Sequence, residues 1–204
     1  MIASDPKGSL VFIFIMEEVI IFIDGAYLSL ISKYLGKGKP LRFDIKKFAL
    51  MLARKEKFYC KEIFYYNCPP FQSSLPTEEE IKKKTGYDKF INKLKNLGLK
   101  IREGRCQRIG EEFSQKGADT LMTIDLVRKA TETKIKNFIL VTSDTDFVPV
   151  IKDIRKNDKI RVIIYYFKDF IKDSIFSMSD HILDICDKKV LFKKEDFENL
   201  HIDN

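Results

Sequence analysis

Short, uninterrupted apolar runs alternate with helical patterns along this chain, and this alternation limits the folds that it can adopt. The two most apolar runs are residues 19–24 (VIIFID) and 137–143 (NFILVTS). Such continuous runs indicate strands that are buried on both faces, as in the centre of a parallel sheet. Parallel strands need long crossover connections, which helices usually supply. The sequence therefore predicts a three-layer α/β domain with a mainly parallel central sheet flanked by helices.

Other segments continue this alternation. Thr77, followed three residues later by Glu80, forms a capping box that predicts a charged helix, with a break near Gly86 and an end at Leu97. The expected strands are 61–68, 159–167 and a less apolar one at 99–108, which should lie nearer an edge of the sheet. The other expected helices are 26–35, 44–57, 117–131 and 146–156, followed by a short helix, an apolar segment at 181–186 and a helical tail from Lys193.

One domain is the simplest organisation for 204 residues, because no repeat or low-complexity linker interrupts the chain. We expect the domain at residues 19–187, an N-terminal extension at 1–18 and a C-terminal tail or helix at 188–204. The segment before Met16 differs from the rest, and one hypothesis is that Met16 is the true start. Its apolar run, residues 10–15, is far shorter than the ~20 residues that span a bilayer.

Composition favours a globular, cytoplasmic protein without a membrane partner. Apolar residues make up 45% of the chain and charged residues 33%, which is typical of a folded domain. Four cysteines occur without a CxxC pair or a zinc-like spacing, so we expect reduced thiols. The net charge of +7 permits an anionic partner, of which nucleic acid is the commonest.

Carboxylates follow both of the most apolar strands. Asp24 ends the first run and Asp144 follows the second. In open parallel sheets, ligands bind beyond the carboxyl ends of the strands. Asp119 lies in the first turn of another predicted helix, which follows a Lys-Gly pair, and Asp146 lies two residues beyond Asp144. The four aspartates are therefore predicted to meet at one rim of the sheet.

A cluster of carboxylates is self-repelling, and a divalent cation is the natural compensation. Mg²⁺ and Mn²⁺ prefer oxygen ligands, and one or two such ions suit phosphodiester hydrolysis. The two histidines of the chain, His181 and His201, lie far from these motifs, so a histidine-based nuclease or a hydrolytic triad is not expected.

Four motifs of the chain, and the order in which they occur, resemble those of the NYN domain, the LabA-like branch of the PIN-like nucleases. The match spans roughly residues 19–187, and each motif lies at a predicted strand or helix end. The motifs are Phe22–Leu28 (FIDGAYL), Tyr65–Pro70 (YYNCPP), Gln115–Asp119 (QKGAD) and Val141–Pro149 (VTSDTDFVP).

The resemblance implies a Rossmann-like, PIN-like fold that cleaves RNA at an acidic metal site. Its metal-site aspartates correspond to Asp24, Asp119 and Asp144, with Asp146 as the usual second acid. A further aspartate of the helix after Lys-Gly corresponds to Asp125, expected to support the site or to pair with a lysine. The departures from the pattern are Tyr27 in place of asparagine, Asn67 in place of aspartate, and Thr142–Ser143 before Asp144.

The sequence allows two interpretations for several of these residues. Asp146 is either catalytic or the N-cap of its helix, and Lys116 either contacts a phosphate or pairs with the carboxylates. Tyr27 either stacks on a base or packs in the core. Arg102, Arg105 and Arg108 lead toward the predicted site and are candidates for phosphate contacts, while Asn67 and Ser143 are expected to support the ligands.

The favoured function is a metal-dependent ribonuclease that uses Mg²⁺ or Mn²⁺ on single-stranded or structured RNA. The alternative is a non-catalytic RNA-binding or regulatory domain, which Tyr27 and Asn67 favour. A phosphatase or receiver-like domain ranks last, because Asp24–Gly25–Ala26 lacks the second acid that such chemistry needs. Assembly into a homo-oligomer is left open.

Overall fold

A six-stranded, wholly parallel sheet forms the centre of the computed structural model, which describes residues 2–4, 10–12, 16–110, 112–168, 180–198 and 200. The strands lie in the order β10-β9-β8-β3-β4-β5. Their bounds are β3 (Glu18–Asp24), β4 (Tyr59–Asn67), β5 (Lys100–Glu103), β8 (Asn137–Val141), β9 (Arg161–Tyr166) and β10 (Lys188–Leu191). The predicted three-layer, Rossmann-like α/β fold is confirmed.

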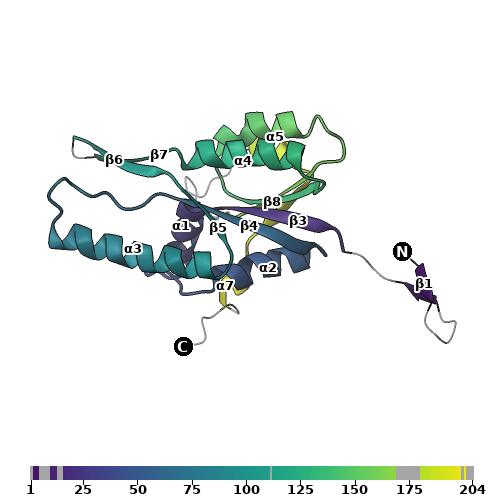
Figure 1. The fold of residues 1–204 in the computed structure, drawn as a ribbon, viewed down its shortest axis with the longest axis horizontal. Helices are drawn as coiled ribbons and strands as arrows, with labels where there is room; N and C mark the ends of the chain where they lie inside the picture. Colours follow the sequence, from purple (N-terminus) through teal and green to yellow (C-terminus); the bar gives the residue numbers. More distant parts are fainter. Residues whose placement is uncertain are drawn as a thin grey trace.

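Helices cover both faces of this sheet, as Figure 1 shows. Because side chains alternate along a strand, Val19, Ile21 and Ile23 pack on one face, while Ile20 and Phe22 pack on the other. The first face is covered by α1 (Gly25–Leu35), α2 (Ile45–Lys55), α3 (Glu78–Asn96) and α7 (Glu195–Glu198). The second is covered by α4 (Ala118–Glu132), α5 (Val148–Ile154) and α6 (Asp180–Asp184).

The expected strand at 99–108 is two strands in different sheets. Its first half, β5, is the edge strand of the central sheet, as predicted. Its second half, β6 (Arg105–Ile109), turns away and pairs antiparallel with β7 (Glu112–Lys116). The predicted break near Gly86 is also wrong, because α3 runs without interruption from a complete capping box between Thr77 and Glu80.

The sheet extends beyond residue 187, where the sequence predicted only a tail or a helix. Strand β10 pairs with β9 and was missed because two of its four residues are exposed lysines. The apolar segment before it is mostly α6. Near the N-terminus, β1 (Ile2–Ser4) pairs with β2 (Leu10–Phe12), and residues 13–15 of the expected extension lie outside the described part. Within the described residues, no helix has the length and apolarity to cross a membrane.

Candidate functional site

The centre of the sheet contains a topological switch point between β3 and β8. From β3 the chain continues into α1 on one face, and from β8 it continues through the short 3₁₀ turn η1 (Thr145–Phe147) into α5 on the other. The two connections diverge at the carboxyl ends of adjacent strands, which is where ligands bind in sheets of this kind. Asp24 ends β3 at this point, and Thr142 follows the last residue of β8.

Asp24 is fixed as the N-cap of α1. Its Oδ1 accepts hydrogen bonds from the backbone N–H groups of Ala26 and Tyr27, at 2.9 and 3.1 Å. The next residue, Gly25, allows α1 to approach β4, since a Cβ there would lie 2.6 Å from Tyr65 and 2.7 Å from the carbonyl oxygen of Tyr66. The Asp-Gly pair therefore combines a cap with a close backbone approach.

Thr142 connects the two central aspartates and was not predicted as a site residue. Its side chain is fully buried, and its Oγ1 donates to Asp24 Oδ2 at 3.4 Å while accepting from the N–H of Asp144 at 3.2 Å. A signal was present in the sequence: a threonine directly follows the apolar run of β8 where the chain must turn. One hydroxyl thus sets the relative position of two acids from distant parts of the sequence.

The capping aspartate of this connection is Asp144, and not Asp146 as one interpretation of the sequence held. Asp144 caps η1, because its Oδ1 accepts from the N–H of Asp146 at 2.8 Å. The helix α5 starts only at Val148, without a side-chain cap, so the N-cap interpretation of Asp146 is wrong. Asp146 is exposed, and capping no longer accounts for its presence.

Asp119 lies in the first turn of α4, at the end of a sharply turned connection. Gly117, the N-cap, has φ of +88°, a left-handed conformation that favours glycine. Unlike Asp24, Asp119 is exposed to solvent. The Lys-Gly pair therefore allows β7 to turn directly into α4 with its acid at the rim of the sheet.

The charges of neighbouring aspartates help to raise the pKa values of Asp24 and Asp119. The pKa of Asp24 rises from 3.8 to about 6, chiefly because of burial; the charges of Asp119 and Asp144 contribute to this rise, and the two N–H bonds oppose it. Partial burial and then the charges of Asp144 and Asp146 raise the pKa of Asp119. Among the described residues, none of these four acids takes part in an ion pair, so their negative charge is uncompensated.

The donor set suits a hard divalent cation in its chemistry, since it consists of carboxylate oxygens that repel one another. Asp24 and Asp144 each commit Oδ1 to backbone N–H groups; Oδ2 of Asp24 also accepts from Thr142, at the long distance of 3.4 Å, and keeps a second lone pair for a cation. No three His, Cys, Asp or Glu side chains of the described part converge closely enough to hold a metal ion as they stand. The residues fit an ion that draws the carboxylates together.

Asp125 lies on the buried side of α4 and is already neutralised. Its two carboxylate oxygens accept from Arg102, at 2.7 and 3.0 Å, and one of them also accepts from Tyr66 Oη at 3.0 Å. The predicted partner of Asp125 was a lysine, whereas the structure provides an arginine. Two donors of Arg102, Nε and Nη2, are thereby committed to Asp125, while a third of its side chain stays exposed.

The two tyrosines near Asp24 are core residues. Tyr27 is 5% exposed, and its Oη accepts from the N–H of Phe167 at 2.9 Å, which leaves no ring face for a base. Burial raises the pKa of Tyr27 to about 12, while a side-chain hydrogen bond from Ser143 lowers it. Asn67 accepts from the N–H of Cys68 and bonds the side chain of Tyr65, so Asn67 and Ser143 order the tyrosines that surround Asp24.

Three predicted phosphate contacts lie on the β6–β7 ribbon rather than in the central sheet. Arg105 and Lys116 form opposite members of one cross-strand pair, and Arg108 lies opposite Phe113. All three basic side chains are exposed. In the part of the chain that the structure covers, Lys116 forms no ion pair with the carboxylates, so the ion-partner interpretation has no support.

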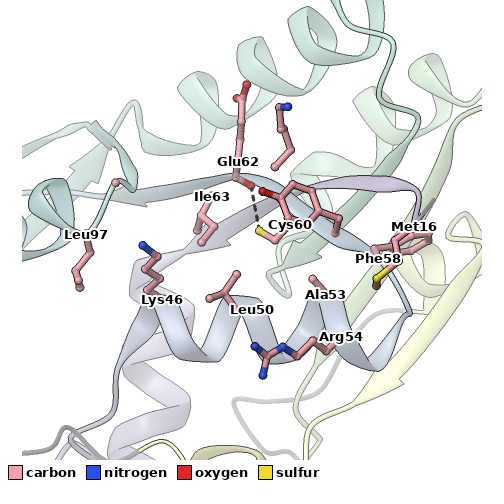
Figure 2. A pocket seen from close by; sticks show the side chains of 13 residues that line it. Met16, Lys46, Leu50, Ala53, Arg54, Phe58, Cys60, Glu62, Ile63 and Leu97 are labelled. Atoms are coloured by element: carbon pink, nitrogen blue, oxygen red, sulfur yellow. Dashed lines mark hydrogen bonds between the residues drawn. The ribbon is translucent and has the colours of Figure 1, made fainter. Parts of the chain in front are cut away.

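A separate pocket lies at the opposite end of the sheet (Figure 2). It has a volume of about 460 Å³ and lies over the start of β4, next to α2, with Lys46, Arg54 and Cys60 among its lining residues. Burial raises the pKa of the Cys60 thiol to about 11, so this thiol stays protonated at neutral pH. All four cysteines are free thiols, as predicted. The pocket shares no residue with the rim of aspartates.

Comparisons with known proteins agree with this fold. A protein of unknown function from Vibrio parahaemolyticus RIMD 2210633 has a similar structure, with a TM-score of 0.60, 16% sequence identity, and coverage of 92% of this chain and 99% of that one. No curated protein matches the sequence. The family model of the NYN domain matches residues 18–188. NYN domains are usually nucleases and generally use divalent metals. The chain therefore belongs to the NYN domain family, within the PIN-like superfamily.

Proposed function

We propose that this protein is a metal-dependent ribonuclease, in which Asp24, Asp119 and Asp144 hold a divalent cation, Mg²⁺ or Mn²⁺. One observation supports the proposal: Thr142 joins Asp24 to Asp144 at the switch point, and the charges of Asp119 and Asp144 raise the pKa of Asp24 with no compensating base among the described residues. Uncompensated carboxylates cost stability, and a bound cation would remove that cost.

The chain's own residues would position the reaction. A bound divalent cation would neutralise the charge that develops on the phosphodiester. Asp24 and Asp144 are preset by backbone N–H groups and by Thr142, so they lose little freedom on binding. We assign Asp146, exposed beside them, to orient the attacking water. Water attacks the phosphorus, the P–O ester bond breaks, and the leaving oxygen takes up a proton.

The positive charges of the β6–β7 ribbon support RNA as the substrate. Arg105, Arg108 and Lys116 are exposed, and β7 leads directly into the helix that carries Asp119. Such contacts would make binding strongly dependent on salt. Four free thiols suit a reducing compartment, so we expect the substrate to be cytoplasmic RNA.

The test is cleavage of single-stranded and structured RNA, with DNA controls, in Mg²⁺ or Mn²⁺ and in chelator. Asp144→Asn should abolish metal-dependent cleavage and weaken Mn²⁺ binding in calorimetry, because it removes one ligand charge. Asp153→Asn is the matched control, since Asp153 is an exposed aspartate of α5 that pairs with Lys156. It should change neither quantity.

Unchanged cleavage in Asp144→Asn would falsify the catalytic assignment. Binding of RNA by the natural protein without cleavage in either ion would instead favour a non-catalytic RNA-binding domain. Asn67, which stands where many family members have an acid, is the residue that favours this second function.

A further inference from the structure

We propose that the β6–β7 ribbon is a base-stacking arm for single-stranded RNA, with Phe113 as its platform. This inference rests on the proposed function, because the arm would guide the RNA toward Asp119. The carrying observation is an exposed aromatic ring in contact with an arginine and a second ring, on a basic ribbon that leads into the helix of Asp119.

Phe113 is exposed far beyond what a core residue tolerates. Its side chain is 61% exposed, and its ring centroid lies 5.4 Å from that of Phe71. The guanidinium carbon of Arg108 lies 5.9 Å from the same centroid, within cation–π range. Arg108 Nε also donates to the carbonyl oxygen of Gly110 at 2.9 Å, which fixes the guanidinium at the end of the ribbon. The ring thus has two neighbours that hold it, while most of the side chain stays exposed.

Phe113 lines a small pocket of about 180 Å³, together with Pro70, Phe71, Glu80, Lys83 and Cys106. Small-molecule sites usually measure ~300–1,000 Å³, so this pocket suits one planar ring rather than a larger ligand. A stable protein interface buries ~800 Å² on each partner, which one exposed ring and its neighbours do not approach. A nucleic-acid base is the planar ligand that the surrounding charge favours.

The ribbon presents cations on both of its faces. Residues directly opposite in an antiparallel pair share a face, so Arg105 and Lys116 lie on one face, while Arg108 and Phe113 lie on the other. None of these three cations forms an ion pair with any described residue, and each is exposed. Stacking on an aromatic ring together with phosphate contacts is how sequence-tolerant proteins bind single strands.

The position of the ribbon connects the arm with the site. Figure 1 shows β6 and β7 projecting from the layered body and leading into α4. Lys116 ends β7, Gly117 makes the left-handed turn, and Asp119 follows in the first turn of the helix. Duplex bases are already stacked on each other, so the platform selects unpaired bases. A strand held at Phe113 that follows β7 would therefore be led toward Asp119.

The experiment measures binding of fluorescein-labelled single-stranded RNA by anisotropy, in EDTA to prevent cleavage. Phe113→Ala should weaken binding by roughly 5- to 150-fold, the range for loss of one stacked base. Phe113→Tyr should restore it, and Phe113→Leu should not, because leucine keeps an apolar side chain without an aromatic face. Tyr59→Ala is the matched control, since Tyr59 is 58% exposed at the opposite end of the sheet.

Two further measurements separate stacking from charge. Phe113→Ala should not affect binding of duplex RNA. Single-stranded RNA in which the stacked nucleotide is abasic should bind equally well to Phe113→Ala and to the natural protein. Arg108→Ala should lower the slope of log K against log salt by about 0.7, whereas Phe113→Ala should leave that slope unchanged.

Equal binding by the natural protein and Phe113→Ala would overturn the arm and leave the ribonuclease proposal intact. Loss of binding in Phe113→Ala, with no cleavage in any ion, would support the arm and contradict the ribonuclease proposal. A dimer of the natural protein in light scattering that Phe113→Ala dissociates, with RNA binding unchanged, would assign Phe113 to contacts between copies of the chain and overturn the arm.

Discussion

Helix α4 carries two aspartates in opposite electrostatic situations. Asp125 is 3% exposed, and a bidentate arginine and a tyrosine satisfy its carboxylate. Asp119, about a turn and a half earlier, is exposed and faces the charges of Asp144 and Asp146 with no ion pair among the described residues. The contacts of Asp125 stabilise the fold, whereas the charge of Asp119 beside other acids destabilises it. This difference distinguishes a structural carboxylate from a candidate ligand.

The largest expected effect on stability concerns Asp125, the structural aspartate of this comparison. Asp125→Ala removes one partner of a buried ion pair and leaves Arg102 and Tyr66 without their acceptor. We expect the free energy of unfolding to fall by about 3–5 kcal/mol, measured by urea denaturation. A double variant, Arg102→Leu with Asp125→Leu, should be less destabilised than Asp125→Ala. A loss below about 1 kcal/mol in Asp125→Ala would show that the pair contributes little.

The second prediction concerns the loss of stability that the charge of Asp24 causes at the rim. The pKa of Asp24 in the folded protein, about 6, lies above its ordinary value of 3.8. Folding therefore takes up a proton between these pH values, and the contribution of this group is fully present below about pH 4 and lost as the pH rises through 6. Asp24→Asn, which keeps a capping oxygen, removes the charge.

In EDTA, Asp24→Asn should be more stable than the natural protein by about 1–3 kcal/mol at pH 8. The range extends down to about 1 kcal/mol because Asp24 is only partly buried and solvent screens its charge. The difference should vanish near pH 4, where both side chains are neutral. Urea denaturation of both proteins at pH 4, 6 and 8 measures it. A constant difference across this range would contradict the assignment of the cost to the Asp24 charge.

The smallest expected effect concerns Thr142, which aligns the rim without carrying charge. Thr142→Val keeps the shape of the side chain but removes the hydroxyl that donates to Asp24 and accepts from Asp144. We expect Mn²⁺ affinity to fall by about 10-fold, as for other groups that orient metal ligands. Calorimetry of Mn²⁺ binding tests this, with Thr142→Ser as the variant that should retain affinity. An unchanged affinity in Thr142→Val would limit Thr142 to packing.

Much of the fold was accessible from local patterns. The runs at 19–24 and 137–143 identified β3 and β8 because strands buried on both faces need apolar residues throughout. The Thr77 capping box identified the start of α3 because that signal depends only on neighbouring residues. Strand β10 and the division of 99–108 escaped prediction, because an edge strand tolerates lysine and a change of sheet at Gly104 has no local signature.

The sequence by itself determined which acids exist and that Asp24 and Asp144 follow strands, because strand periodicity and Asp-Gly turns are local properties. Only the tertiary structure decided what each acid does. It placed Arg102 against Asp125, the hydroxyl of Thr142 between Asp24 and Asp144, and Arg105 and Arg108 on an outlying ribbon. Compensation of a charge depends on residues distant in the chain, so a local pattern does not encode it.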